Sequence, residues 1–208
     1  MLAFHRVDDH AVCRFEPAEI NLLRGLIGQL IELLMESAPP ANGPGTARLP
    51  QEFFVESDAT AGDDEVFERL EREMVSEDDF NDEPSNDPVL KRLFPDPYPD
   101  DPSAGYDFQR FTHAAQLDDK VTTARVVLAD LDAIADDGRC AVCGTHTMGW
   151  LKTLTNLRLA LAARLDIRNG DDADQIGELP DDDPRSWTFS IYEWLGWVQE
   201  SLLNAQDE

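Results

Sequence analysis

Two cysteines, Cys140 and Cys143, are the residues whose types and spacing best suit chemistry in this chain. Two thiols separated by two residues can close one disulfide or supply half of a metal site. The chain has three cysteines in 208 residues, and Cys13 is the third. Three cysteines cannot build the disulfide framework of a small extracellular domain. An isolated pair of this spacing in an intracellular protein is more often redox-active or metal-binding.

A redox-active disulfide between Cys140 and Cys143 is the leading interpretation. We expect the two thiols to face each other across a turn, a geometry in which this disulfide closes easily. The sequence after Cys143 predicts a helix, and the positive end of a helix favours a reactive thiolate. Such a thiolate reacts with oxidants, and a neighbouring thiol resolves the resulting sulfenic acid. The acidic residues Asp136 and Asp137 oppose this, and Arg139 offsets part of their effect. Two chemically passive loop cysteines are the alternative.

A metal site is a second interpretation of the same pair. Its ligands would be Cys140, Cys143 and His146, with a fourth from Cys13, His5, His10 or His113. Zinc sites built on this spacing usually present a second matching pair, which the sequence lacks. We therefore expect no metal and no cofactor.

Nothing in the sequence indicates an enzyme. A thioredoxin-type enzyme needs the cysteine pair after a strand in a βαβ unit, and no such unit is predicted near Cys140. No Ser/His/Asp order, phosphate-binding glycine loop or HExxH motif is present. We expect a protein without catalytic residues.

Net charge is the second strong constraint. The chain has 17 basic and 43 acidic residues, which leave a formal charge of −26. Proteins that bind nucleic acid gain much of their affinity by pairing Lys and Arg with phosphates. We therefore expect no autonomous DNA binding. Acidic surfaces steer encounters with basic protein surfaces, so a protein partner is expected. The alternative is that the acidity serves solubility alone.

No targeting segment is predicted. The first residues do not combine a basic head with a long apolar run, as a signal peptide would. No apolar run approaches the roughly 20 residues that a membrane span needs. A cytoplasmic location is expected.

The elements that position the cysteines are mostly helices. Residues 4–15 alternate apolar and polar side chains and predict a β-hairpin. Pro17 opens a helix that ends near Ser37, with an apolar stripe at helical spacing. Further helices are predicted at 64–74, 87–94, 104–112, 118–135, after the cysteine pair to Leu165, and from Ser186 onward. We expect one mainly α domain over residues 1–208, with a small N-terminal hairpin and acidic, flexible insertions at 38–63, 76–86 and 169–184.

Three tryptophans, Trp187, Trp194 and Trp197, lie on the last predicted helix. Trp194 falls on the apolar stripe of that helix, and Trp197 borders it. Core packing is the ordinary role of such residues. The alternative is that both rim a groove for a protein partner, because aromatic anchors recur at interfaces.

Three segments carry a family resemblance: DPVLKRLFPDPY at 87–98, WLKTLTNLRLALAARL at 150–165 and YEWLGWVQESL at 192–202. With the hairpin and the first helix, they resemble the AosR family of oxidative-stress regulators over nearly the whole chain, apart from the acidic insertions. The resemblance implies a cytoplasmic transcriptional regulator that senses oxidant through cysteines. It also implies action with a stress sigma factor or RNA polymerase through protein–protein contacts.

The leading hypothesis is a redox-responsive regulator. Oxidation would join Cys140 to Cys143 and change a surface that a partner recognises. A constitutive interaction or scaffold protein and a zinc-stabilised helical domain are the alternatives.

Overall fold

A computed structural model describes residues 1–38, 87–180 and 182–207, which belong to one compact unit. The elements in chain order are β1 (Leu2–Val7), β2 (His10–Arg14), α1 (Pro17–Glu36), α3 (Pro88–Leu93), α4 (Pro102–Asp132), β3 (Arg139–Cys143), α5 (Gly144–Arg164), α6 (Gly170–Gly177) and α7 (Pro184–Asn204). The predicted mainly α class with a small N-terminal sheet is confirmed. The predicted insertions at 38–63 and 76–86 and the helix at 64–74 lie outside the described residues, apart from Ala38. None of the described helices is long and apolar enough to span a membrane.

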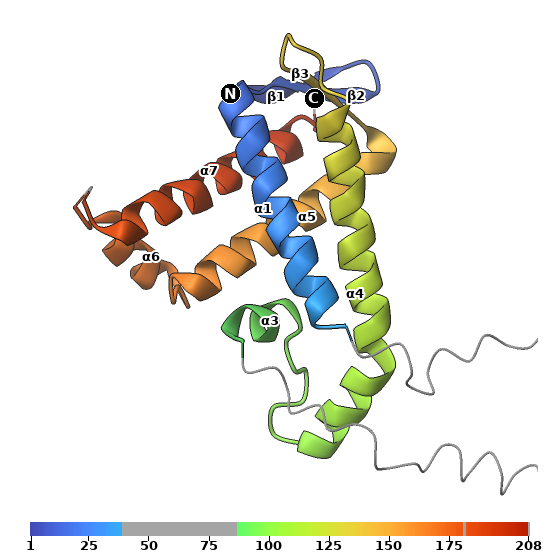
Figure 1. Ribbon diagram of the computed structural model, residues 1–208, viewed down its shortest axis with the longest axis vertical. Helices are drawn as coiled ribbons and strands as arrows, with labels where there is room; N and C mark the ends of the chain where they lie inside the picture. The colour runs from blue at the N-terminus through green and yellow to red at the C-terminus, as the bar shows by residue number, and fades with distance from the viewer. Residues whose placement is uncertain (39–86, 181, 208) are drawn as a thin grey trace, which may run out of the picture. The chain divides into compact units, whose positions relative to one another are not determined.

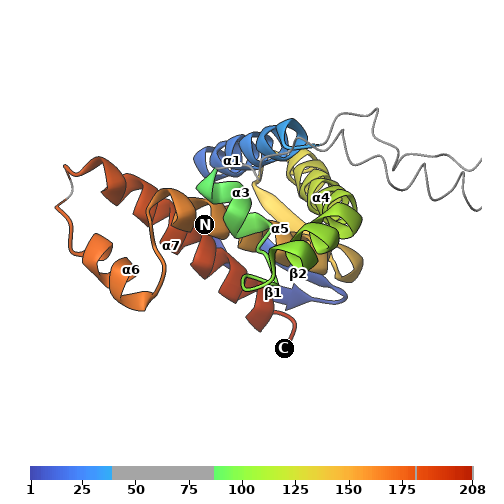
Figure 2. The same ribbon diagram turned by 90° about the horizontal axis from the view of Figure 1, so that it is seen from below.

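Helix α5 is the centre of the unit. It packs against α3, α4 and α7 and contacts α1. Figure 1 shows α1 crossing in front of α5, with α4 on one side and α7 on the other, and Figure 2 shows the same arrangement from below. The inward side of α5 carries Trp150, Leu154 and Leu157, all buried. The Trp150 ring lies against the rings of Phe4 and Phe15, so the sheet and the helices share one core.

The sheet has three antiparallel strands in the order β1-β2-β3. The predicted hairpin is confirmed as β1 and β2. The third strand was not predicted, because Arg139–Cys143 is too short to show an alternation of its own. The turn before this strand is at Gly138, whose φ of 72° suits glycine. The Phe15 N–H donates to the Gly138 carbonyl over 2.9 Å.

Two helical predictions need correction. The separate helices at 104–112 and 118–135 are one continuous helix, α4, which Asp101 caps. No Gly or Pro follows Gly105 within α4, so nothing interrupts it. The segment 169–184 was predicted as a loop, yet it contains α6. Asn169 starts α6 with a capping box that includes Asp172.

Candidate functional site

All three cysteines lie on two paired strands. Cys13 is on β2, and Cys140 and Cys143 are on β3. In the antiparallel register Cys13 lies directly opposite Cys140, and His10 lies directly opposite Cys143. All three thiols are free. The prediction that Cys140 and Cys143 face each other across a turn is wrong, because both belong to a strand.

Cys13 and Cys140 form a buried thiol pair. Their exposed fractions are 2% and 1%. Opposite residues of antiparallel strands have Cα atoms about 4.5–5.5 Å apart, within the range of about 4.4–6.8 Å that disulfides span. Burial, together with a hydrogen bond to Cys140, raises the pKa of the Cys13 thiol well above its ordinary value. The Cys13 thiol therefore stays protonated at neutral pH, which makes it a poor nucleophile.

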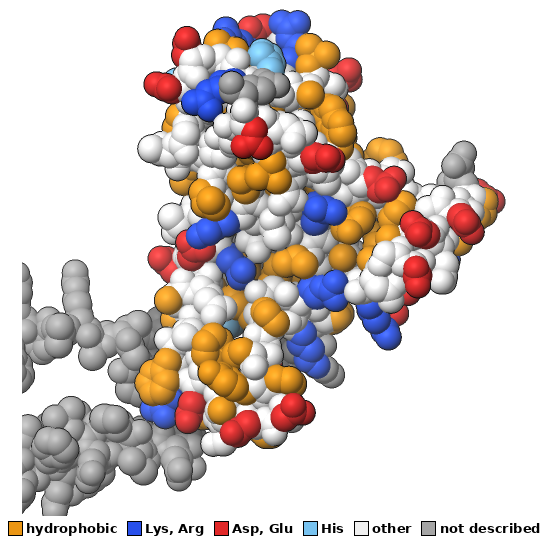
Figure 3. Space-filling view, turned by 180° about the vertical axis from the view of Figure 1, so that it is seen from behind, with side chains coloured by type: hydrophobic (Ala, Val, Ile, Leu, Met, Phe, Trp, Pro, Cys, Tyr) orange, Lys and Arg blue, Asp and Glu red, His pale blue; other side chains and the backbone are white. Residues whose placement is uncertain are grey.

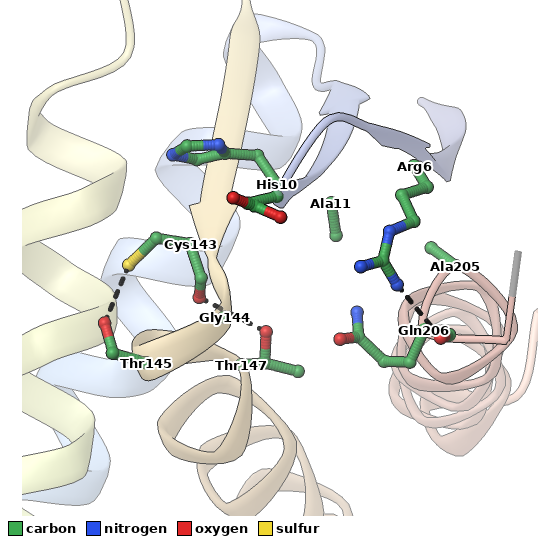
Figure 4. Close-up of a pocket in the computed structure, with 10 residues that line it drawn as sticks. Arg6, His10, Ala11, Cys143, Gly144, Thr145, Thr147, Ala205 and Gln206 are labelled. Atoms are coloured by element: carbon green, nitrogen blue, oxygen red, sulfur yellow. Dashed lines mark hydrogen bonds between the residues drawn. The ribbon is translucent and has the colours of Figure 1, made fainter.

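Cys143 is the accessible thiol. It is half-buried, and it is both the last residue of β3 and the N-cap of α5. It borders an open pocket of about 400 Å³ whose other lining residues include Arg6, His10 and Gln206. Figure 4 shows Cys143 Sγ directed toward Thr145, whose Oγ1 is 3.1 Å away. On the other side of the pocket, the Arg6 guanidinium donates to the Gln206 carbonyl over 3.2 Å. The Sγ atom is thus directed away from Arg6 and Gln206, and its contact with Thr145 lies at the exposed surface, where a small oxidant can reach it.

Cys140 and Cys143 point to opposite faces of β3. Side chains alternate along a strand, so residues three apart lie on opposite faces. Their Cα atoms are about 10 Å apart in an extended chain, whereas a disulfide requires less than about 7 Å. The burial of Cys140 and the partial exposure of Cys143 agree with this alternation. A disulfide between them requires β3 to leave its place beside β2.

The third residue of the candidate metal set, His146, has another partner. Its Nδ1 lies 3.0 Å from Asp130 Oδ1, and Asp130 also accepts a hydrogen bond of 2.8 Å from Trp150 Nε1. Within the described ranges, no three His, Cys, Asp or Glu side chains are arranged to hold a metal ion. Because Cys140 and Cys143 are on opposite faces of β3, the structure does not bring them together with His146 as ligands.

The two candidate partner-binding tryptophans lie on α7. Trp194 is half-buried and packs against the core, whereas Trp197 is 42% exposed. Trp187, near the start of the same helix, is 70% exposed. Trp187 was noted on this helix from the sequence, but only Trp194 and Trp197 were predicted as interface candidates.

Sequence reasoning also missed the pairing of Cys13 with Cys140. Cys13 was considered only as a fourth metal ligand. The alternation around Cys13 does predict its strand, but no local signal predicts which segment pairs with that strand. The partner of Cys13 depends on β3, which forms only beside β2.

Comparisons with known proteins place these residues in a family context. Residues 1–206 match the model of a family described as a domain of unknown function, DUF2017. Proteins of Mycobacterium tuberculosis and Mycobacterium bovis, each named oxidative stress regulator AosR, are 32% identical to this chain over 128 residues. The match covers 56% of this chain and 57% of each relative, so the chain spans little more than half of their length.

A third relative covers more of the chain. A protein of Mycobacterium leprae, named putative oxidative stress regulator AosR, is 29% identical over 204 residues, which cover 91% of this chain and 79% of that protein. No solved structure matches the chain.

Proposed function

This chain belongs to the DUF2017 family, and from that premise we propose that it is a redox-responsive, cytoplasmic regulator of transcription in the oxidative-stress response. The name of its curated relatives, oxidative stress regulator, supports the regulatory role. Regulation would proceed through contacts with a protein partner, for which the family resemblance implies a stress sigma factor or RNA polymerase. The net charge of −26 supports protein contacts over direct DNA binding.

The observation that carries the proposal is the unequal exposure of the two cysteines of β3. A hydroperoxide that reaches the exposed side of Cys143 transfers one oxygen atom to Cys143 Sγ and leaves as water or an alcohol. The Cys140 thiol then attacks the sulfenic sulfur of Cys143. The S–S bond forms, and the sulfenic hydroxyl leaves as water with the proton of the attacking thiol. Two thiols are oxidised, and one peroxide is reduced.

The disulfide acts as a switch because the folded strand cannot accommodate it. Cys140 reaches Cys143 only after β3 separates from β2, so the disulfide stabilises the form in which β3 is unpaired. Separation also exposes Val142, which is otherwise fully buried, and alters the start of α5. A partner that binds one of the two forms more tightly is thereby regulated by oxidation.

A disulfide between Cys13 and Cys140 would have the opposite effect. It would link β2 to β3 and stabilise the closed sheet. The two pairings therefore predict different behaviour of β3 on oxidation, which makes them separable by experiment.

The test is intact mass spectrometry combined with hydrogen exchange, before and after a mild dose of hydrogen peroxide. We expect the wild-type chain to lose two hydrogen atoms and the β3 amides of Ala141 and Val142 to exchange faster. The Cys140→Ser and Cys143→Ser variants should show neither change, whereas Cys13→Ser should retain both.

Two results would contradict the proposed switch. Loss of the disulfide in Cys13→Ser, with retention in Cys143→Ser, would identify the cross-strand pair as the redox-active one. Three free thiols after peroxide treatment would indicate a constitutive interaction protein with passive cysteines.

A further inference from the structure

We propose that the exposed edge of α7 docks a basic amphipathic helix of a partner protein. This edge, the tryptophan face, consists of Trp187, Trp194 and Trp197. The inference deepens the proposed regulation through protein contacts by assigning a surface and a partner chemistry. It does not depend on any cysteine.

The three rings lie on one side of a rigid helix. At about 100° per residue, positions 187, 194 and 197 fall within an arc of about 80°. They span ten residues, or about 15 Å along the axis. The adjoining side of α7 is anchored in the core by buried Leu195 and Val198. The tryptophan face is therefore presented without any need for rearrangement, which reduces the entropic cost of binding.

Exposure of this size favours a binding role over simple packing. Trp187 is 70% exposed and Trp197 is 42% exposed. Trp194 is half-buried and joins the face to the core. Tryptophan is enriched among the residues that dominate binding energy at protein interfaces. A row of aromatic anchors about three helical turns long matches the spacing at which a partner helix presents its apolar side chains.

The charge of α7 indicates a basic partner. Glu193 and Glu200 are exposed beside the tryptophan face, and neither forms a hydrogen bond or ion pair with a described residue. The basic residue of this helix, Arg185, lies at its start and pairs with Asp183 over 2.9 Å. Lys and Arg side chains of a partner can pair with the two free carboxylates and lie over the indole rings. The overall charge of −26 steers such a partner toward the protein.

A second aromatic surface provides a contrast. Phe111 on α4 is 75% exposed, but the guanidinium of Arg110 lies 5.8 Å from its ring centroid. That surface thus carries its own cation next to its exposed ring. It is a suitable control site, because its exposed ring is comparable and its local charge is different.

The test uses reduced protein and a synthetic amphipathic helix of Leu and Lys, about four turns long. Isothermal titration at about 0.15 M salt should show binding that the Trp187→Ala/Trp197→Ala variant weakens at least about tenfold. Phe111→Ala should leave the affinity unchanged. Glu193→Gln/Glu200→Gln should weaken binding about threefold or more and flatten its salt dependence. The same peptide with Glu in place of Lys should not bind.

Equal affinity of the wild-type and both α7 variants would overturn the inference, as would equal binding of the Glu peptide. Light scattering tests the alternative that a second copy of this chain binds the tryptophan face. A dimer that dissociates in the tryptophan variant would also overturn the inference. Because no oxidant is present, failure here leaves the disulfide proposal untouched, and failure of the disulfide leaves this surface untouched.

Discussion

At the scale of single residues, solvent access separates the three thiols. Cys143 borders a pocket, whereas Cys13 and Cys140 are covered by the sheet and the core. A sulfur that reacts first with an oxidant must be both deprotonated and exposed in the folded protein. The raised pKa of Cys13 keeps that thiol protonated, so it is not the first to react. Cys140 is not the first to react because it is buried.

We expect iodoacetamide to alkylate Cys143 at least about tenfold faster than Cys13 and Cys140 in the native reduced protein. Peptide mass mapping over time measures the three rates. In about 6 M guanidinium chloride, where the chain is unfolded, the three rates should converge. Comparable native rates would contradict the assignment of Cys143 as the accessible thiol.

Asp130 is a polar residue that bonds directly to a core side chain. It accepts the hydrogen bond of the Trp150 indole, which is fully buried. Asp130→Ala leaves that N–H without its acceptor, so we expect the free energy of unfolding to fall by about 1–3 kcal/mol. Urea denaturation measures the change. Asp119→Ala breaks the exposed ion pair with Lys152 and should cost less than about 1 kcal/mol. Equal losses would show that the indole hydrogen bond contributes little.

At the scale of elements, the decisive feature is the strand that carries the cysteine pair. β3 is anchored at one end by the hydrogen bond between Phe15 and Gly138 and continues into α5 at the other. A Cβ at position 138 would lie 2.3 Å from the Phe15 carbonyl oxygen. Only glycine satisfies both the positive φ and this close approach.

We expect Gly138→Ala to lower the free energy of unfolding by about 2 kcal/mol, from the left-handed conformation and the displaced hydrogen bond. The amides of β3 should also exchange faster in this variant. Gly144→Ala is the matched control, since nothing lies within 4 Å of its added Cβ. A loss of stability as large in the control would rule out the anchoring role of Gly138. Thermal denaturation of both variants measures the two losses of stability.

At the scale of the whole molecule, charge is spread unevenly. Figure 3 shows Lys and Arg side chains gathered across the middle of one face, with Asp and Glu around them. Some cations have neutral partners: Lys120 donates to Asn156, and Arg158 donates to Gln199. Burial lowers the pKa of Lys120. The described surface is thus not uniformly acidic, although the net charge of the chain is −26.

We expect no measurable binding of a DNA duplex at about 0.15 M salt, because long-range repulsion outweighs these few cations. Fluorescence anisotropy of a labelled promoter fragment tests this. Weak binding confined to low salt would fit a non-specific contact with the basic residues. A tight complex at about 0.15 M would contradict regulation through protein contacts alone.

The sequence by itself determined the features that depend on neighbouring residues. The stripe of α1, the proline starts of α1 and α3, the hairpin and the acidic charge could all be predicted, because periodicity and capping act within a few turns. The cysteine spacing correctly drew attention to residues 140–143, and the family resemblance agreed with the relatives found by comparison.

The tertiary structure alone decided what those cysteines can do. Residues 139–143 become a strand because the open edge of β2 satisfies their backbone hydrogen bonds, and that edge lies far away in the sequence. This pairing places Cys140 opposite Cys13 on the buried side of the sheet, whereas Cys143, at the end of the strand, borders the pocket. Strand pairing is non-local, so no window of sequence around the cysteines could have specified it.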